Sequence, residues 1–268
     1  MGRYAPRAPH FEKSLLPFRP KPRTDELFSS WLCHISNGYD VRLQSFCHLL
    51  WPDIAIWNRD VDRSASEALL MSVARMTATP EAAARQTLLR GLEGRLFRRF
   101  IPNGHTRWIM PLGLYHRTRR RPGLQFCPKC LVSPASYWRR SWRLSLITLC
   151  DVHHCVLLDR CPQCSYPIHF HRSGMGKRRS TELVPISVCT KCGQDLIAPA
   201  EEPDPSSRAI AFQDELRSQL SNSTYSLEYF EVLAHLASLL ATPRARFVAF
   251  RKLVSTCSGQ GGSQSRDH

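Results

Sequence analysis

Apolar residues recur at helical spacing along much of the chain. Leu27, Trp31 and Ile35 lie four positions apart, which predicts a helix that begins near Thr24 and ends at Gly38. Similar patterns predict further helices over about 41–51, 64–76, 79–89, 207–221, 226–241 and 244–256. The sequence therefore predicts a mainly α fold.

Two of these helices are joined by the short turn Thr77-Ala-Thr79, which makes them a helix-turn-helix candidate. Ser64-Ala-Ser-Glu67 has the form of a capping box, and Pro80 would open the second helix. The side chains of the second helix that could reach base edges in DNA are Arg85, Gln86 and Arg90. A solvated helix face has the same pattern, so both interpretations stay open.

Cysteine spacing is the strongest chemical signal, since eight of the eleven cysteines fall between Cys127 and Cys192. Four pairs have two residues between their ligands: Cys127/Cys130, Cys150/His153, Cys161/Cys164 and Cys189/Cys192. This spacing lets a tight turn point both side chains at one ion. Eight ligands suffice for two closed zinc sites, which stabilise a fold rather than catalyse. His154 could replace His153, and Cys155 is expected to be a small buried hydrophobe.

The charge distribution points to a polyanionic or acidic partner. The formal net charge is +15, and the stretch 95–150 contains twelve Lys or Arg but no Asp or Glu. A solvated face normally mixes both signs, so we expect a surface that contacts phosphate or an acidic protein. Arg98, Arg99 and Arg143 belong to this stretch. The arginines that we expect at such a contact are Arg117, Arg119, Arg120, Arg121, Arg139 and Arg140.

The expected organisation has five parts and a linker. They are a flexible basic N-terminal tail (1–23), a helical domain with the helix-turn-helix candidate (24–122), a double zinc-binding module (123–198), a linker (199–206), a C-terminal helical bundle (207–257) and a disordered tail (258–268). The tail 1–23 could also dock on a partner. No run approaches the ~18 apolar residues of a membrane span, and paired cysteines are typical of metal sites in a reducing compartment, so we expect a cytoplasmic protein.

Several stretches of the sequence resemble the TniQ family of transposition target-selection proteins. The most specific are Gly123–Leu131 (GLQFCPKCL), Tyr137–Leu144 (YWRRSWRL), Leu149–His153 (LCDVH) and Leu157–Cys164 (LLDRCPQC). Glu26–Leu32 (ELFSSWL) resembles the opening helix of the family, and Arg107–Gly113 (RWIMPLG) also fits its pattern. The resemblance covers roughly residues 24–195.

The resemblance implies a mainly α fold with a small zinc-ribbon-like module, in which helix-turn-helix elements flank two structural zinc sites. It implies two Zn²⁺ per chain. One site would use Cys127, Cys130, Cys150 and His153, and the other Cys161, Cys164, Cys189 and Cys192. The implied partners are an AAA+ ATPase regulator of the TnsC type, a CRISPR effector or other target-recognition complex, DNA or RNA, and a second copy of the chain.

Three functions follow from these observations as hypotheses. The first is a non-catalytic adaptor that bridges a targeting complex to the AAA+ regulator in transposition. The alternative is a stand-alone DNA-binding protein that recognises an attachment site. An enzyme is not expected, because a metal-dependent transposase needs a cluster of carboxylates, and the stretch 95–150 has none.

Overall fold

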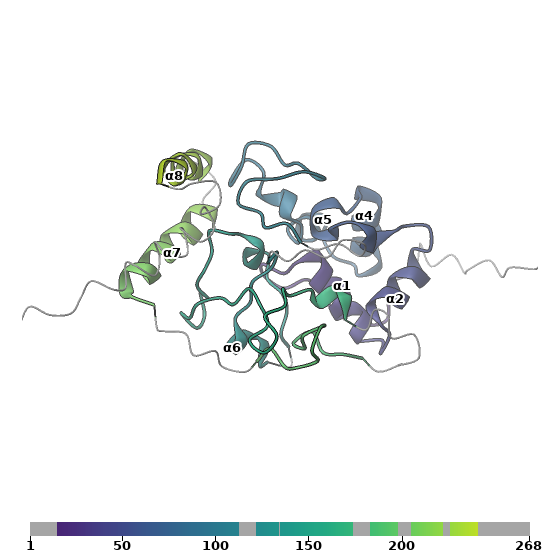
Figure 1. Ribbon diagram of the computed structural model, residues 1–268. Coiled ribbons are helices and arrows are strands. Elements are labelled where there is room, and N and C mark those ends of the chain that lie inside the picture. Colours follow the sequence, from purple (N-terminus) through teal and green to yellow (C-terminus); the bar gives the residue numbers. More distant parts are fainter. Residues whose placement is uncertain are drawn as a thin grey trace, which may run out of the picture.

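The structure is a computed structural model that describes residues 15–112, 122–133, 135–173, 183–197, 205–221 and 226–240. Helices dominate these ranges, where extended pairing is confined to isolated bridges (Figure 1). The α-helices are α1 Phe28–Asn37, α2 Leu43–Leu50, α3 Val61–Ser64, α4 Glu67–Met76, α5 Glu81–Arg85, α6 Pro128–Leu131, α7 Ser207–Ser221 and α8 Ser226–Leu240. The short 3-10 helices are η2 Ile56–Asn58, η3 Leu89–Leu92, η4 Ser141–Arg143 and η5 Phe170–Arg172.

The mainly α fold expected from the sequence is confirmed. None of the described helices is long and apolar enough to cross a membrane. Residues 1–14, most of the expected linker, the expected helix 244–256 and the tail 258–268 lie outside the described residues.

Helix α1 begins at Phe28 rather than near Thr24, because distant acceptors take its first N–H groups. The Phe28 N–H donates to the carbonyl of Thr87 (3.0 Å). The Ser29 N–H donates to the carboxylate of Asp62 (2.8 Å). A helix N-terminus leaves these donors without partners inside the helix, so long-range contacts rather than a local cap fix where α1 starts.

Helix α4 is capped by Ser66, whose hydroxyl accepts the N–H of Leu69 at 3.2 Å. The capping box was predicted to begin at Ser64, which is two positions too early, since Ser64 is the last residue of α3. The two serines are separated by a single residue, and the sequence pattern alone could not choose between them.

Helix α5 ends at Arg85, well before the predicted end near Leu89. The Thr87 hydroxyl donates to the carbonyl of Ala84 (2.6 Å), which closes the helix. The N–H groups of Thr87 and Leu88 donate to the carbonyls three positions back, those of Ala84 (3.1 Å) and Arg85 (3.2 Å), so the α-helical pattern is not continued. The second helix of the helix-turn-helix candidate is thus little more than one turn long.

The described part of the expected tail, residues 15–23, lies against the helical core. Leu16 is buried, and its N–H donates to the carbonyl of Met76 at the end of α4 (2.8 Å). The Trp31 indole N–H donates to the carbonyl of Pro20 (2.8 Å). Residues 15–23 therefore differ from a flexible tail, because they satisfy polar groups of α1 and α4.

The segment after the first cysteine pair is joined to the start of the helical region. Glu26 and Arg139 form an antiparallel bridge, and the Arg140 N–H donates to the carbonyl of Asp25 (2.6 Å). Next to this bridge, Trp138 is fully buried and stacks on Phe170 at a ring-centroid distance of 4.8 Å. One hydrophobic core runs through the helical and cysteine-rich parts, so packing is continuous across the expected boundary at 122/123.

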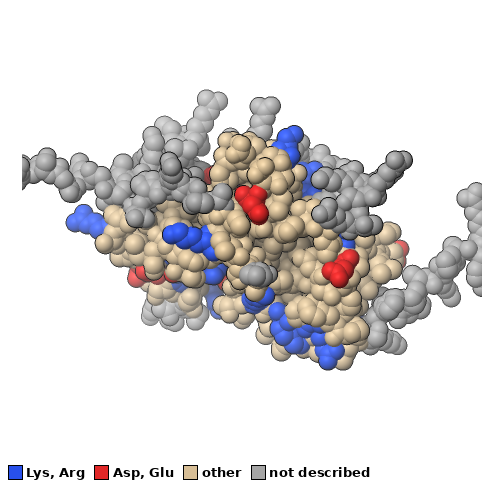
Figure 2. Space-filling model, turned by 90° about the horizontal axis from the view of Figure 1, so that it is seen from below, with Lys and Arg blue, Asp and Glu red and all other residues tan. Residues whose placement is uncertain are grey.

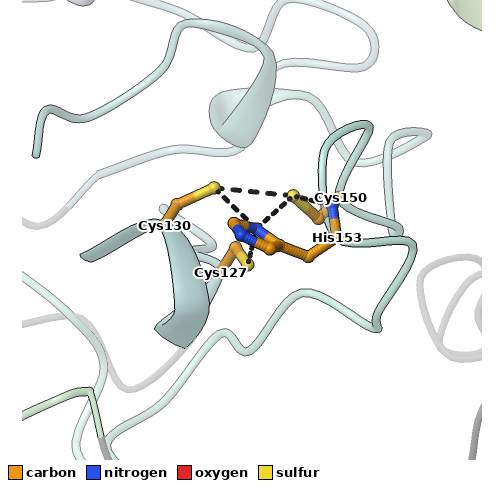
Figure 3. A group of neighbouring side chains, drawn as sticks. All are labelled: Cys127, Cys130, Cys150 and His153. Atoms are coloured by element: carbon orange, nitrogen blue, oxygen red, sulfur yellow. Dashed lines mark hydrogen bonds between the residues drawn. The ribbon is translucent and has the colours of Figure 1, made fainter. Parts of the chain in front are cut away.

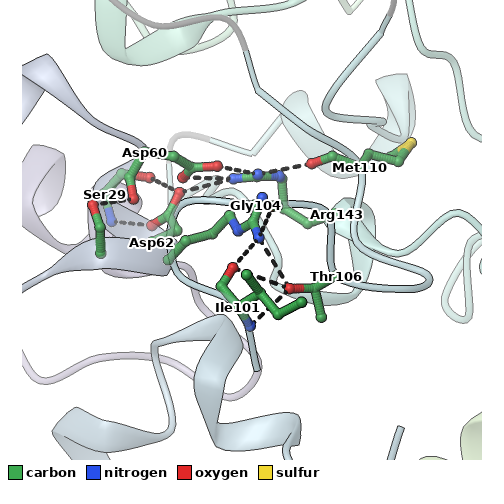
Figure 4. A network of polar contacts seen from close by, with 10 residues as sticks. Ser29, Asp60, Asp62, Ile101, Gly104, Thr106, Met110 and Arg143 are labelled. Atoms are coloured by element: carbon green, nitrogen blue, oxygen red, sulfur yellow. Dashed lines mark hydrogen bonds and ion pairs between the residues drawn. The ribbon is translucent and has the colours of Figure 1, made fainter. Parts of the chain in front are cut away.

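A buried guanidinium lies at the centre of this packing (Figure 4). Arg143 is 0 % exposed, and its Nη2 donates to Asp60 Oδ2 (2.5 Å) and to the carbonyl of Met110 (2.9 Å). Its Nη1 lies 3.3 Å from Asp62 Oδ2. Two carboxylates and a carbonyl thus compensate a charge that would otherwise be costly to bury.

Asp62 links this guanidinium to α1. Its carboxylate accepts both the N–H and the hydroxyl of Ser29, each at 2.8 Å. Burial, followed by the charge of Asp60, raises the pKa of Asp62 to about 6, while Arg143 and Ser29 act in the opposite direction. The carboxylate is therefore still largely ionised at neutral pH, as the ion pair requires.

Helix α7 is attached to the cysteine-rich part by the amide side chain of Gln213 and by Arg217, which donates to the carbonyl of Leu149. Gln213 is fully buried; its Oε1 accepts the N–H of Thr148 (2.8 Å), and its Nε2 donates to the carbonyl of Leu146 (3.0 Å). These are backbone groups that a neighbouring strand would otherwise pair. Helix α8 packs on α7 and buries Phe230.

Two buried histidines lie beside the central network. His169 Nδ1 is 2.9 Å from the carbonyl of Pro167, and Trp57 stacks on His171 at 5.8 Å. Burial lowers the pKa of His169 to about 4, with Arg172 adding to the effect. Burial also lowers the pKa of His171 well below its usual value. Both imidazoles are therefore neutral in the folded protein near neutral pH.

Replacing Arg143 should cost much of the stability. Arg143→Met leaves the buried carboxylate of Asp62 and the partly buried one of Asp60 without their counter-charge, and we expect the free energy of unfolding to fall by about 3–5 kcal/mol. Urea denaturation measures this change. Arg59→Met is the matched control, because Arg59 is exposed and its loss should stay within about 0.5 kcal/mol. Equal effects of the two substitutions would contradict a structural role for the network.

Acidification should destabilise the protein through His169. Its pKa is about 4 when folded against 6.5 as the reference value, so the unfolded chain binds the proton first. Stability is therefore complete above pH 6.5 and is lost as pH falls towards 4, by about 3 kcal/mol from this residue. His169→Gln should flatten the dependence of unfolding free energy on pH over this window. An unchanged slope would show that His169 is charged when folded.

Candidate metal centres

Three of the four ligand pairs share one turn conformation. The N–H four positions after the first cysteine donates to the carbonyl of that cysteine, at 2.9 to 3.0 Å. The donor residue has a left-handed φ each time: 48° at His154, 55° at Ser165 and 77° at Gly193. Glycine adopts this conformation freely, whereas other residues are strained by about 1 kcal/mol. Glycine therefore marks only one of the three turns in the sequence.

The residues around each turn also pair in the same antiparallel register. The cysteine N–H donates to the carbonyl five positions later in all three turns, at 2.8 to 3.0 Å. The flanking bridges are Leu149↔Val156, Arg160↔Pro167 and Val188↔Asp195. A local turn closed in this way directs both ligand side chains to one side, which is why their spacing alone predicts the pair.

The remaining pair opens helix α6 instead. Pro128 takes its first position, and the Leu131 N–H donates to the carbonyl of Cys127 (3.2 Å). Phe126, immediately before this pair, forms two hydrogen bonds with Leu158, both 2.8 Å long. This bridge places α6 beside the turn that follows Cys150.

The first cluster consists of Cys127, Cys130, Cys150 and His153 (Figure 3). The Sγ atoms of Cys130 and Cys150 are 3.6 Å apart. His153 Nδ1 lies 3.4 Å from the Sγ of Cys127 and 3.3 Å from that of Cys130. His153, and not His154, is the imidazole that the structure brings to the three thiols.

The second cluster consists of Cys161, Cys164, Cys189 and Cys192, whose sulfur atoms all lie within 4.8 Å of one another. The Sγ atoms of Cys161 and Cys192 are 3.7 Å apart, as are those of Cys164 and Cys189. Cys161 and Cys189 are buried, whereas Cys192 is exposed, so this cluster is open to solvent on one side.

Both clusters fit a tetrahedral zinc ion. Zn–S and Zn–N bonds in such sites imply edges of about 3.8 Å between sulfurs and about 3.5 Å between sulfur and nitrogen. The sulfur–sulfur contacts of 3.6 to 3.7 Å and the sulfur–nitrogen contacts of 3.3 to 3.6 Å are close to these values, and all ligand atoms of each cluster lie within 4.8 Å of one another. Thiolate and imidazole donors suit zinc, and four protein ligands would leave no position for substrate.

Thiol acidity links metal binding to protons. Burial, together with the neighbouring thiols of Cys192 and Cys189, raises the pKa of Cys164 to about 12. Burial also raises the pKa of Cys161. Such thiols stay protonated at neutral pH unless a cation is close, so a metal ion would displace their protons on binding.

Sequence reasoning missed the position of Cys155. Its Sγ lies 3.5 Å from that of Cys127, at the edge of the first cluster, and the side chain is only half buried. Cys155 packs against the core as expected, but it is only partly buried. The signal was its position five residues after Cys150, where the shared turn brings the chain back towards the ligands.

The candidate base-contacting arginines face one carboxylate. Glu67 pairs with Arg85 and, at 2.9 Å, with Arg90. Gln86 follows the last residue of α5 and is exposed. The two arginines thus join α4 to the end of α5, which leaves Gln86 as the candidate without a charged partner among the described residues.

Arg139 and Arg140 are also paired within the protein. Arg139 Nη1 is 3.0 Å from Asp151 and its guanidinium lies over the ring of Trp142 at 5.8 Å. Arg140 Nε is 3.4 Å from Asp25. Together with Arg143, they show that part of the acid-free stretch meets acids from elsewhere in the fold.

The other predicted contact residues, Arg117, Arg119, Arg120 and Arg121, lie outside the described residues. On the face shown in Figure 2, the coloured basic side chains form separate groups within a largely uncharged surface. The described part of that face therefore lacks one continuous basic patch.

A model of the TniQ family matches residues 17–157, which is more than half of the chain. The matched range contains the first cysteine–histidine cluster and ends before Cys161, so the second cluster lies beyond it. A search of curated proteins found no match.

Each cluster should hold one metal ion independently. We expect Cys127→Ser and Cys161→Ser each to lose one zinc ion per chain and to destabilise the cysteine-rich part, because the binding energy contributes to folding. Elemental analysis after dialysis measures the loss. Cys155→Ser is the control and should keep both ions, since Cys155 is outside both ligand sets. Full zinc retention in Cys161→Ser would exclude a four-cysteine site.

Proposed function

The chain belongs to the TniQ family of transposition-associated target-selection proteins, and on this basis we propose that it is an adaptor. It bridges a DNA-targeting complex, such as a CRISPR effector, to the AAA+ ATPase that regulates the transposase. TniQ proteins are non-catalytic, and their partners belong to the transposition machinery and include DNA. Within that role, this chain would supply two binding surfaces held at a fixed separation.

The observation that carries this proposal is the donor chemistry. Among the described residues, the only groups of three or more His, Cys, Asp or Glu that could share a metal ion are the two cysteine clusters. Their closed donor sets support a structural role. The acids Asp60 and Asp62 at the start of α3 are neutralised by Arg143, so they are poorly suited to hold catalytic ions.

We further propose that each chain holds two zinc ions and works in the cytoplasm. All four thiols of the second cluster are free cysteines held at metal-ligand separations rather than disulfides. A reducing compartment would keep them in this state. A second copy of the chain remains a proposed partner.

The part of the chain before about residue 60 is proposed to contact the AAA+ ATPase. Leu49 and Ile54 are exposed there, at 57 % and 38 %. Ile54 also lines a groove of about 540 Å³ with Trp51, Met71 and Ala78. Exposed apolar side chains beside a groove are typical of protein contacts. The cysteine-rich part and α7–α8 would then face the targeting complex.

The alternative, a stand-alone protein that recognises an attachment site, has less support. Its recognition helix would be α5, which is short and has Arg85 paired with Glu67. A binding titration still separates the two functions, because a specific binder prefers its site to random duplex by about 10³-fold or more.

The adaptor proposal predicts separable surfaces. The double variant Leu49→Asp/Ile54→Asp should weaken capture of the purified AAA+ ATPase at least about tenfold, because it places charge in an apolar contact. Capture of the targeting complex should be unchanged. Val232→Asp, on an exposed position of α8, is the reciprocal control and should affect only the targeting complex.

Three results would count against the proposal. A reversed pattern in the two variants would exchange the two surfaces. A preference of about 10³-fold for one duplex by the protein alone would favour the stand-alone binder. Cleavage or joining of DNA by the purified chain would contradict the adaptor role itself.

A further inference from the structure

Four arginines lie on the described loop that follows η3, and we call them the arginine ridge: Arg95, Arg98, Arg99 and Arg107. All four are exposed. In the described part of the chain, Arg95, Arg99 and Arg107 form no ion pair, and only Arg98 is paired with an acid. This sets the ridge apart from Arg139, which is neutralised internally.

Hydrogen bonds from a buried side chain fix the loop that carries the ridge. The buried Arg63 donates through Nη2 to the carbonyls of Ile101 (2.6 Å) and Gly104 (2.7 Å) and to the Thr106 hydroxyl (3.0 Å) (Figure 4). Its guanidinium also lies over the ring of Phe100 at 5.6 Å. The ridge is therefore preorganised, and a ligand would not have to order the loop.

The tight turn at the start of the ridge adds to this rigidity. Gly94 has a φ of 78°, and its N–H donates to the carbonyl of Phe97 (2.9 Å). Phe97 and Phe100 are buried against each other at 5.9 Å. Buried aromatic rings thus alternate with exposed guanidinium groups, which turns Arg95, Arg98 and Arg99 towards solvent.

Helix α8 places a carboxylate on this ridge. Glu231 is bidentate to Arg98, with Oε2 at 2.7 Å from Nη2, and Arg98 remains 75 % exposed. The hydrogen bond to Arg98, with Arg107 nearby, lowers the pKa of Glu231. Two ridge arginines therefore act on one carboxylate, whose paired oxygens resemble those of a phosphodiester.

We propose that the arginine ridge binds the phosphate backbone of a nucleic-acid duplex and that Glu231 of α8 occupies this site in the free protein. This inference adds a nucleic-acid site to the proposed function. It rests on that function only for the statement that the site is used in transposition. Exposed ion pairs are weak, so a duplex that contacts several arginines at once can displace the single glutamate.

The chemistry of the ridge favours nucleic acid over an acidic protein. Protein interfaces have an apolar centre, whereas Ile101 is the one large hydrophobic side chain among residues 94–107 that is markedly exposed. The other exposed neighbours include Asn103, Gly104 and His105. One exposed apolar side chain is a small anchor for a protein interface, whereas the charged and polar groups around it suit a phosphate backbone, which provides regular charge and no apolar surface.

Fluorescence anisotropy of the full chain with a labelled random duplex of about 20 base pairs tests the ridge. Arg98→Ala/Arg107→Ala should weaken binding at least tenfold at low salt. It should also flatten the slope of log affinity against log salt by about one unit per lost contact. Both residues are exposed, so folding and zinc content should not change. Affinity and slope equal to those of the unmodified chain would overturn the proposal.

The role of α8 is tested by removing one charge. Glu231→Gln should raise duplex affinity two- to fivefold. Glu215→Gln is the matched control: it removes the same charge from the same helix pair, but its carboxylate bonds Gln219 within α7. Equal effects of the two variants would show that α8 does not cover the ridge.

The two proposals fail in distinguishable ways. If the ridge variant binds duplex normally but loses capture of the targeting complex, the ridge contacts an acidic protein and the nucleic-acid inference is wrong. If the ridge variant loses duplex binding, the nucleic-acid inference is supported. If the Leu49/Ile54 variant still captures the ATPase normally, the proposed ATPase surface is wrong, whatever the ridge variant does.

Discussion

The fold depends on the burial of one positive charge. Arg143 is completely enclosed, and enclosing its charge is costly unless carboxylates replace the lost water. Asp60 and Asp62 supply them from the start of α3, and Asp62 in turn holds the first turn of α1 through Ser29. The order of the helical region and the position of the cysteine-rich part are therefore set by the same ion pair. It acts together with the Thr87 carbonyl at the start of α1 and with the Arg140–Asp25 contact at the bridge beside Trp138.

Local features of the site could be predicted from the sequence, and long-range ones could not. The cysteine pairs were recognisable because each is closed by a turn of a few residues, whose geometry needs nothing from the rest of the chain. The length of α5 was not, because the chain just after it is held by a contact that is distant in the sequence, the hydrogen bond from the Phe28 N–H to the Thr87 carbonyl. The partners of Arg139 and Arg140 were hidden for the same reason, since a run of like charge gives no information about which distant acids it will meet.

The basic side chains behind the net charge of +15 therefore fall into two groups rather than one surface. One group is paired with acids inside the fold, and the other is exposed to solvent. Arg139, Arg140 and Arg143 stabilise the fold by pairing with Asp151, Asp25, Asp60 and Asp62. Screening by salt weakens exposed charges much more than buried ones, so these two groups respond differently to ionic strength. Composition alone assigned them to one polyanion-binding face because it counts charges without their environment.

The continuous core has a mechanical consequence. Two binding modules joined by a flexible linker only raise the local concentration of one partner near the other, and they leave the angle between partners free. Here the helical region, the cysteine-rich part and α7–α8 share one hydrophobic core, and Gln213 fastens α7 through backbone groups. Whatever binds at opposite ends is held at a set distance and angle. A rigid molecule of this kind sets the distance between its partners, so the position of one partner determines where the other is placed.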